Sequence, residues 1–460
     1  MSASATRLDP ASIADLGKSI KGRVIGPGDA DYNSRRMVHS PAFDRRPAVI
    51  VRVANADDVR RVIDLARESA LELAVRSGGH SSVGHGTTEG GIVLDLGDMK
   101  GLEIDVKSGT AWAEAGLTAV EYTKATHEHG LVTGFGDTGS VGIGGITTGG
   151  GVGYFVRKFG LTIDDLLAAD VVTADGKLLR ADEKTNPDLF WAVRGGGGNF
   201  GVATRFHFRM HPVKNVFGGM LILPATADAI AGFMAAAEAA PEELSGIANI
   251  MPAPPMPFLA QEHHGKLIIM AELVYAGEGP AAEAALAPFR SLAAPLADML
   301  KTMPYPEIYP PDDPNYRPTA EVRTLFIDNV DASVAGMMLD RLKSAPVPFA
   351  VTQLRVLGGA MARVPADATA FAHRKSRIMA NLVALYGKPE EKEPSEAWVT
   401  DYMAALRQTD AGAYVNFLGD EGPQRVRAAY PSPTWERLVS IKKQYDPANL
   451  FRLNQNIPPA

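Results

Sequence analysis

Two glycine-rich segments hold the residues whose types and spacing point most directly to chemistry. Residues 76–81 (RSGGHS) follow an apolar run and place two glycines before a histidine. Such a turn directs successive backbone N–H groups at an anion such as phosphate, and Arg76 adds positive charge. Residues 139–153 (GSVGIGGITTGGGVG) space their glycines too irregularly for a helix and too densely for a strand. Apolar residues interleave with these glycines, which favours a buried segment against a large flat ligand over a mobile surface loop.

Other binding motifs fit the sequence poorly. Residues 134–139 (GFGDTG) match the dinucleotide pattern G-x-G-x-x-G, but polar residues precede them and no acidic residue lies about 20 positions further on. P-loop, zinc-protease and nucleophile-elbow motifs are absent from the sequence. The ten histidines show no metal-ligand spacing, and the chain has no cysteine. We therefore predict neither a metal site nor a Rossmann-type nucleotide site.

Composition and charge exclude several classes of protein. Lysine and arginine number 46 against 53 aspartates and glutamates, and the resulting net charge of −7 argues against nucleic-acid binding. No apolar stretch approaches the about 20 residues of a membrane span, and the first residues lack the layout of a secretory signal. The absence of cysteine excludes disulfides and thiolate nucleophiles. The simplest expectation is a cytoplasmic protein that binds neither nucleic acid nor membrane.

The elements that must position these residues divide into two regions. Up to about residue 212, short β-branched runs alternate with amphipathic segments, which predicts a β-α-β unit leading into residues 76–81. From residue 214 to about 410, longer apolar strands alternate with alanine-rich helices, which predicts an α+β unit on a mainly antiparallel sheet. The predicted strands are 48–53, 71–75, 92–96, 171–176, 220–225, 266–275, 349–358 and 377–386, and the predicted helices are 59–66, 118–129, 228–239, 281–293, 332–343 and 432–445. We also expect an irregular loop at 305–318, a charged connector at 388–396 and a strand near 414.

Five motifs in order make the sequence resemble a known family. They are RSGGHS (76–81), GSVGIGGITTGGGVGYFVRKFGL (139–161), DLFWAVRGGGGNFGV (188–202), YVNF (414–417) and YDPANLFRLNQNIPP (445–459). The chain resembles the berberine-bridge-enzyme-like branch of the vanillyl-alcohol-oxidase flavoprotein superfamily, and within it bacterial members with one covalent flavin bond. The resemblance implies an α+β fold with a PCMH-type FAD-binding domain in two parts, 1–213 and 412–460. An inserted α+β substrate domain, 214–411, is expected to be built on an antiparallel sheet.

The resemblance also implies a cofactor and its contacts. FAD is expected to be bonded covalently to His80 through the methyl group of its benzenoid ring. Many relatives form a second bond through a cysteine, but Thr138 aligns with that position and only one bond is expected. The cofactor-binding residues implied are Arg76, Ser77, Gly78, Gly79, His80, Ser81, Thr138, Gly139, Gly142, Ile143, Gly144, Gly145, Gly149, Val152, Gly153, Val202, Asn454 and Asn456.

The catalytic base of related alcohol oxidases is missing from this sequence. Phe417 stands where these relatives carry a tyrosine that takes the hydroxyl proton as a phenolate, and phenylalanine cannot do this. A glutamate of other relatives aligns near Ala380 or Asn381, which cannot ionise. A neutral amine needs no strong base, because its lone pair drives hydride loss to the flavin. The catalytic candidates are Tyr154, Asn381, His373 and Tyr414, with Tyr386, Gln353 and Arg374 as further polar groups near the same strands.

The resemblance bears on the electron acceptor as well. Val141 occupies a position where relatives that react with oxygen carry a small residue. We therefore expect an FAD-dependent oxidase of a small organic substrate, an amine or an alcohol or phenolic hydroxyl, that reduces molecular oxygen to hydrogen peroxide. Two alternatives stay open: an FAD dehydrogenase with a different acceptor, and a flavin-bearing protein with little catalytic activity.

Overall fold

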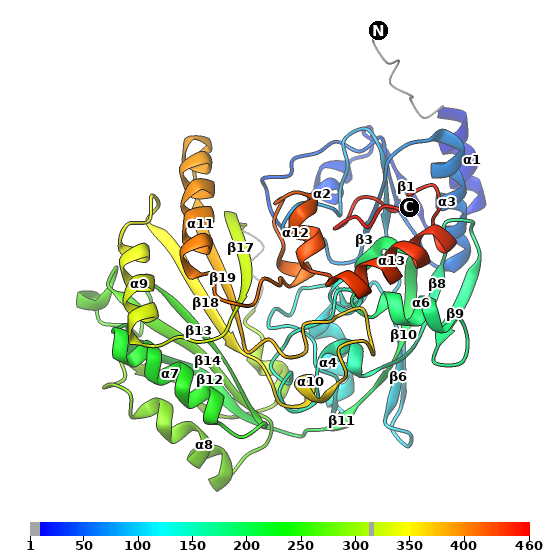
Figure 1. Cartoon of the computed structure of the whole chain (residues 1–460). Coiled ribbons are helices and arrows are strands. Elements are labelled where there is room, and N and C mark those ends of the chain that lie inside the picture. Colours follow the sequence, from blue (N-terminus) through cyan, green and yellow to red (C-terminus); the bar gives the residue numbers. More distant parts are fainter. Residues whose placement is uncertain (1–9, 312–316) are drawn as a thin grey trace.

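A four-stranded sheet near the N-terminus carries the loop at residues 76–81 (Figure 1). The computed structural model describes residues 10–311 and 317–460. The strands run in the order β1-β2-β4-β3, and both β2 and β3 lie parallel to β4. Because parallel strands end at the same edge, the residues after β3 leave the sheet beside those after β4. The sheet and its helices are β1 (Arg23–Ile25), β2 (Val49–Arg52), β3 (Leu73–Arg76), β4 (Ile92–Asp95), α1 (Pro10–Ser19), α2 (Tyr32–Arg36) and α3 (Ala56–Ser69).

The helix α3 shows how local sequence builds this unit. Asn55 caps the helix, and its side chain accepts a hydrogen bond from the backbone N–H of Asp58 at 3.0 Å. The stripe of Val59, Val62 and Ile63 is fully buried against the sheet. The β-α-β unit predicted from the sequence is therefore confirmed.

A second sheet of five antiparallel strands stacks beside the first. Its order is β5-β6-β10-β8-β9. Strands β7 and β11 form a separate two-stranded sheet, and β11 follows β10 directly in the sequence. Its elements and the associated helices are β5 (Leu102–Asp105), β6 (Thr110–Glu114), α4 (Ala119–His127), β7 (Leu131–Val132), α5 (Ile143–Thr148), β8 (Leu166–Val172), β9 (Leu178–Asp182), α6 (Pro187–Val193), β10 (Val202–Arg209) and β11 (His211–Pro212).

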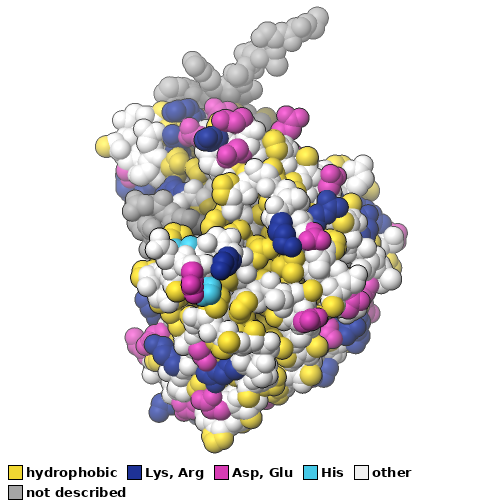
Figure 2. Space-filling model, turned by 90° about the vertical axis from the view of Figure 1, so that its left-hand side faces the viewer, with side chains coloured by type: hydrophobic (Ala, Val, Ile, Leu, Met, Phe, Trp, Pro, Cys, Tyr) yellow, Lys and Arg dark blue, Asp and Glu magenta, His cyan; other side chains and the backbone are white. Residues whose placement is uncertain are grey.

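The third sheet has eight strands, all paired antiparallel, as predicted for this part of the chain. Helices α7, α8, α9 and α11 pack on one face, and the other face is turned toward the first two sheets (Figure 1). Figure 2 shows that cationic and anionic side chains intermingle on the helix-covered side of the molecule. The elements are β12 (Val216–Pro224), α7 (Ala227–Ala239), β13 (Leu244–Pro252), β14 (Leu267–Tyr275), α8 (Pro280–Arg290), β15 (Ala297–Asp298), β16 (Lys301–Met303), β17 (Thr319–Ile327), α9 (Ala332–Lys343), β18 (Phe349–Val356), α10 (Ala360–Arg363), β19 (Ile378–Tyr386) and α11 (Lys392–Leu406).

The C-terminal segment returns to the first two sheets. Helix α12 (Pro423–Ala428) is followed by α13 (Ser432–Tyr445), which lies beside α6 in Figure 1. Leu438, Phe451 and Ile457 join the same hydrophobic core as β2, β4 and β10, whereas a separate core lies between the third sheet and its helices. The α+β fold class is therefore confirmed, and the domain boundaries at 213 and 411 stay predictions.

Three local predictions were wrong. The glycine run is not wholly irregular, because Ile143–Thr148 forms the helix α5. This helix packs so closely on Ser77 that glycine suits the contact, although glycine has a poor helix propensity. The charged connector at 388–396 becomes a 3₁₀ turn and the start of α11, whose buried face already includes Ser395 and continues through Trp398. No strand forms among the described residues from 414 onward: Val415–Phe417 is a short 3₁₀ turn instead. In the expected loop at 305–318, Tyr305–Ile308 forms a 3₁₀ turn, and residues 312–316 lie outside the described residues.

Candidate functional site

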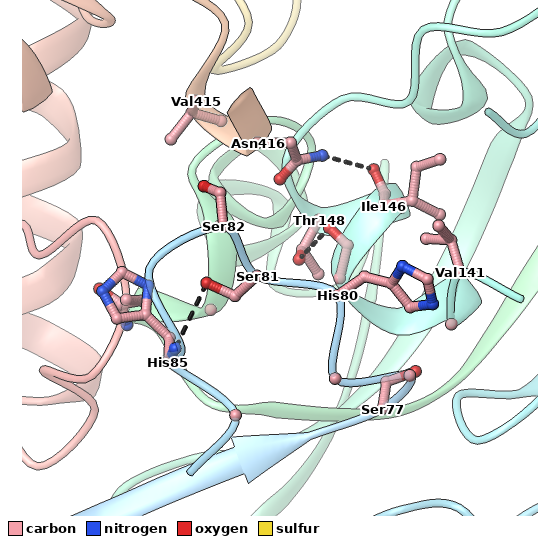
Figure 3. A pocket seen from close by; sticks show the side chains of 18 of the residues that line it. Ser77, His80, Ser81, Ser82, His85, Val141, Ile146, Thr148, Val415 and Asn416 are labelled. Atoms are coloured by element: carbon pink, nitrogen blue, oxygen red, sulfur yellow. Dashed lines mark hydrogen bonds between the residues drawn. The ribbon is translucent and has the colours of Figure 1, made fainter. Parts of the chain in front are cut away.

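A cavity of about 600 Å³ lies between the ends of β3 and β10 and the open face of β17, β18 and β19 (Figure 3). Its volume is within the range of small-molecule and cofactor sites. The predicted cofactor residues that line it are Arg76, Ser77, Gly78, Gly79, His80, Ser81, Thr138, Gly142, Gly144, Gly145, Val152, Val202 and Asn454.

The loop after β3 forms one wall with its backbone. Gly79 has φ +72°, a left-handed conformation that favours glycine. A Cβ on Gly78 would lie 2.3 Å from the backbone nitrogen of Gly142, so the two chain segments touch with no room for side chains. Within the described residues, the backbone N–H groups of Gly78, Gly79 and Ser81 donate to no partner. Unpartnered N–H groups are what the predicted anion-binding turn requires, and anion binding itself stays a prediction.

Arg76 does not supply the positive charge proposed for this turn. Its guanidinium is buried and donates to Asp95 Oδ2 at 2.8 Å and to the carbonyl of Arg35 at 2.6 Å. The carboxylate of Asp95 neutralises it, because the two charges are held together away from water. Arg76 therefore stabilises the loop from behind, and only its aliphatic stem approaches Gly79 and Gly86 in the cavity wall.

His80 lies at the edge of the cavity. Its ring stacks on the ring of His39, with centroids 4.2 Å apart and an interplanar angle of 19°. The backbone N–H of His39 donates to the carbonyl of Gly79 at 3.0 Å, which anchors this stack to the loop. In Figure 3 the side chain of His80 extends toward Val141, which also lines the cavity.

Several glycines of residues 139–153 allow neighbouring chain segments to pack in direct contact. A Cβ on Gly153 would lie 1.4 Å from the carbonyl oxygen of Phe135, and a Cβ on Gly149 would lie 2.0 Å from Asn416 Oδ1. At Gly145, by contrast, a Cβ would meet nothing within 4 Å. Predicted cofactor residues that do not line the cavity are Gly139, Ile143, Gly149, Gly153 and Asn456.

The C-terminal tail closes the wall opposite the glycine run. Asn454 lines the cavity, and its Oδ1 is buried with no hydrogen-bond partner among the described residues. Asn456 Oδ1 is also buried without such a partner, although this residue stands behind the lining. Lys442, fully buried, holds the tail by donating to the carbonyl of Phe451 at 3.0 Å and to Asp446 Oδ2 at 2.6 Å.

The third sheet supplies a row of amides to the cavity. Gln353 lies directly opposite Asn249 on one neighbouring strand and Asn381 on the other. Asn381 Nδ2 donates to Gln353 Oε1 at 3.0 Å, and Gln353 Nε2 donates to Asn249 Oδ1 at 2.9 Å. Gln353 and Asn381 line the cavity, and Ala320, Val322 and Val383 add apolar surface to the same face.

An ion pair crosses from this sheet to the glycine-rich segment. Arg355 Nη2 donates to Asp137 Oδ2, and both residues line the cavity. The Arg355 guanidinium carbon lies 5.2 Å from the centre of the Phe417 ring, in a cation–π geometry. Sequence reasoning missed Asp137 and Arg355, because their pairing joins positions 218 residues apart.

Tyr414 is the catalytic candidate that faces the cavity with a fixed hydroxyl. Its oxygen accepts hydrogen bonds from the backbone N–H of Gly151 at 2.9 Å and from Asn416 Nδ2 at 3.0 Å. Burial raises the pKa of Tyr414, outweighing these donors, so the phenol is neutral near pH 7. Asn416 also donates to the carbonyl of Ile146 at 3.3 Å, a bond drawn in Figure 3.

Tyr154 and His373 lie outside the cavity lining. Tyr154 donates to Glu272 Oε2 at 2.6 Å, and burial followed by the charge of Glu272 raises its pKa well above the usual value. His373 Nε2 lies 2.8 Å from the carbonyl of Ala429, and burial lowers its pKa. Neither side chain borders the space that a substrate would occupy, so the geometry does not support a catalytic role for them.

The other polar candidates also have structural partners. Arg374 is fully buried and forms two hydrogen bonds with Asp164, at 2.7 and 2.9 Å. Tyr386 pairs with Thr319 at the far end of β19 and does not line the cavity.

The lining also contains His85, which belongs to no motif of the sequence analysis. Burial, followed by the charge of Arg45, lowers the pKa of His85 to about 4. Its backbone N–H donates to Ser81 Oγ at 3.3 Å, which ties it to the loop after β3 (Figure 3). A histidine that stays neutral adds no charge to the cavity near pH 7.

These features fit FAD, the cofactor that the resemblance implies. The unpartnered N–H groups of the loop after β3 suit a pyrophosphate, and the buried oxygen of Asn454 suits a donor on the ligand. No group of three or more histidines, aspartates or glutamates in the described ranges is arranged to hold a metal. None of the helices in the described part of the chain combines the length and hydropathy that a bilayer crossing requires.

Comparison with known proteins agrees with FAD as the cofactor. A family described as an FAD binding domain matches residues 47–182, and one described as berberine and berberine like matches residues 413–458. An uncharacterised FAD-linked oxidoreductase of Bacillus subtilis, YvdP, is 31% identical over 458 residues, covering 96% of this chain and 99% of the relative. The (R)-6-hydroxynicotine oxidase of Paenarthrobacter nicotinovorans is 28% identical, covering 96% and 97%.

A solved structure extends this likeness to the fold. The crystal structure of 6-hydroxy-D-nicotine oxidase from Arthrobacter nicotinovorans matches with a TM-score of 0.86 at 26% identity, covering 96% of this chain and 98% of that one. The cavity, the order of the motifs and these full-length similarities lead to one assignment. The chain belongs to the berberine-bridge-enzyme-like family of FAD-linked oxidoreductases.

Proposed function

We propose that this oxidoreductase is an oxidase of a small organic molecule, with FAD bonded to His80 and molecular oxygen as the acceptor. The observation that carries the proposal is one continuous cavity, bordered by His80 and the glycine segments on one side and by the third sheet on the other. This arrangement leaves the face of β18 and β19 as the substrate side of a flavin held by the loop after β3.

Each wall has its own task in this proposal. The backbone N–H groups of Gly78, Gly79 and Ser81 hold the pyrophosphate, and Asn454 accepts a hydrogen bond from the cofactor. When bound, FAD supplies the site that accepts a hydride from the substrate. The third sheet and Phe417 enclose the substrate and exclude water from the reacting carbon.

The absence of a strong base favours a substrate that binds as a neutral molecule. Of the described residues in the lining, the only carboxylate is that of Asp137, which is paired with Arg355. Tyr414 is a neutral phenol, and Phe417 cannot take a proton. A neutral amine satisfies these conditions best, since its lone pair drives hydride loss. A hydroxyl compound would have to carry an already acidic hydroxyl, because no base among the described lining residues is available to take its proton. Similarity to an enzyme named (R)-6-hydroxynicotine oxidase supports oxidation of a small molecule.

Covalent attachment is tested on a denaturing gel. Acid-treated gels of the purified protein should show a fluorescent flavin band at the mass of the chain, and the band should disappear in His80→Ala. As a matched control, His39→Ala removes the stacked ring and should leave the band. A wild-type protein that releases all its flavin on denaturation would refute the attachment.

The acceptor and the substrate class need kinetic experiments. Stopped-flow mixing of reduced enzyme with air-saturated buffer should reoxidise the flavin rapidly and yield hydrogen peroxide. Anaerobic screening of amines, alcohols and phenols should bleach the flavin, with amines reacting preferentially at a pH above their own pKa. Slow reoxidation by oxygen would instead identify a dehydrogenase, and failure of every compound to bleach would indicate a protein with little catalytic activity.

A further inference from the structure

We infer that Arg355 binds the substrate, using Nη1 to hold a carbonyl or hydroxyl oxygen of a small, mainly apolar and uncharged molecule. The inference rests on the proposed function, because it takes the face of β18 and β19 as the substrate side of the cavity. It adds a specificity-determining residue and narrows the chemistry of the substrate.

The guanidinium of Arg355 has nitrogens that donate to described protein atoms and one that does not. Arg355 Nε donates to Gln353 Oε1 at 3.2 Å, and Nη2 donates to the same oxygen at 2.7 Å and also to Asp137. Nη1 donates to no residue in the described ranges, and it is not among the buried atoms that lack partners. Because Arg355 lines the cavity, its Nη1 protons are the donors left for a bound molecule.

The amide row holds this donor in place. Arginine can only donate, so Gln353 must present its oxygen to Arg355 and its Nε2 to Asn249. Asn381 must then present its Nδ2 to the same Gln353 oxygen, at 3.0 Å. Each amide orientation follows from the arginine, and the three strands fix the geometry before any ligand arrives. A donor held in advance costs little ordering entropy when a ligand binds.

The paired charges of Asp137 and Arg355 favour a substrate oxygen that carries no charge. Asp137 offsets the charge of Arg355, and both lie in a largely buried environment, with side-chain exposures of 21% and 6%. A bound carboxylate would leave one negative charge without compensation, which is unfavourable in a low-dielectric site. A carbonyl or hydroxyl oxygen accepts from Nη1 without this penalty.

The rest of this cavity wall favours a mainly apolar substrate. Ala320, Val322 and Val383 face the same cavity, and Phe417 packs against the guanidinium. Gln353 Oε1 already accepts three hydrogen bonds, and the Gln353 amide nitrogen is committed to Asn249. Besides Arg355 Nη1, the amide row leaves Asn381 Oδ1 without a partner in the described ranges, and that atom is buried. This wall therefore offers few groups to a polyhydroxylated compound such as a sugar, and suits a compact ring with a single oxygen anchor.

The test compares two probes of nearly equal shape on the flavin-loaded full chain. Acetophenone carries a carbonyl oxygen, and α-methylstyrene replaces that oxygen with a methylene group that accepts no hydrogen bond. Calorimetric titration gives the ratio of their dissociation constants for each variant, which cancels the general effect of apolar burial. Arg355→Leu should shift this ratio against acetophenone by about tenfold or more, as expected for a hydrogen bond from a charged donor.

Further variants separate binding from general disruption. Gln353→Leu removes the acceptor that orients the guanidinium and should weaken the acetophenone preference. Val383→Ala enlarges the same wall and should change the affinity for both probes alike.

Flavin content is measured on the same samples, so that the two claims fail separately. A protein without flavin would count against the proposed function. A fully loaded Arg355→Leu protein with an unchanged probe ratio would overturn the role of Arg355.

Discussion

Gly145 offers a way to separate the stability of the fold from the binding of the cofactor. It lies in α5 and lines the cavity, and a Cβ there would meet no protein atom within 4 Å. In Gly145→Ala the folded protein gains a methyl group without a clash, and alanine is the better helix former by about 0.5–1 kcal/mol. We therefore expect the thermal midpoint of the protein without flavin to stay constant or rise.

Cofactor binding should change in the opposite direction. The added methyl projects into the space that we assign to FAD, where overpacking typically costs about 1–3 kcal/mol, or roughly a 5- to 150-fold loss of affinity. The measurement is made in a His80→Ala background, so that binding is reversible, by titrating FAD and following the quenching of its fluorescence. Gly142→Ala is the contrasting variant, because its Cβ would lie 2.2 Å from Ser77 Oγ and 2.3 Å from the nitrogen of Gly78, and it should lower both stability and binding.

The pair of variants makes the reasoning refutable. If Gly145→Ala binds FAD as tightly as its parent, the open space beside this glycine is not cofactor space. If Gly145→Ala unfolds as readily as Gly142→Ala, the conclusion that its Cβ meets no protein atom is wrong.

Three further predictions follow from other residues. Val141→Leu should slow reoxidation of the reduced flavin by oxygen in stopped flow, and an unchanged rate would count against a role for this position. His85 has a folded pKa of about 4 against 6.5 in the unfolded chain, so the unfolded state binds the extra proton and stability should fall as pH drops through that window. The loss should approach the order of 3 kcal/mol, and thermal midpoints should show a weaker pH dependence in His85→Gln. Lys442→Met leaves Asp446 buried without its cation and should lower the free energy of unfolding by about 3–5 kcal/mol in urea titrations, with partial recovery when Asp446→Asn is added.

Periodicity allowed the regular elements to be predicted well. The buried stripe of α3 and the long apolar strands β14 and β19 follow patterns of residue type that one local segment contains. β13 and β17 were missed: the first contains Gly246 and Asn249, and the second opens with polar residues. β13 is a strand because it pairs with β14 and β18, and β17 because it pairs with β19, and no local window contains these partners.

The sequence allowed glycines of the cavity wall to be predicted, but not the side-chain pairs that form between distant segments. Gly78 and Gly142 could be assigned to the wall because their lack of a side chain is visible in the sequence. The neutralisation of Arg76 by Asp95 and the pairing of Arg355 with Asp137 depend on which strands become neighbours. For the same reason, His373 was a plausible base by residue type but its ring is directed to a backbone carbonyl outside the cavity.

The cavity wall joins residues made very early and very late in synthesis. Ser82 donates to the carbonyl of Leu418 at 2.9 Å across a sequence separation of 336 residues, and the tail around Asn454 completes the same wall. A ribosome adds residues at roughly 5–20 per second, so the loop after β3 waits tens of seconds for these partners. FAD therefore meets a finished binding site only after nearly the whole chain has been translated. We therefore expect cofactor loading to come late, and we expect removal of the residues around Asn454 to lower the flavin content while the sheets still form.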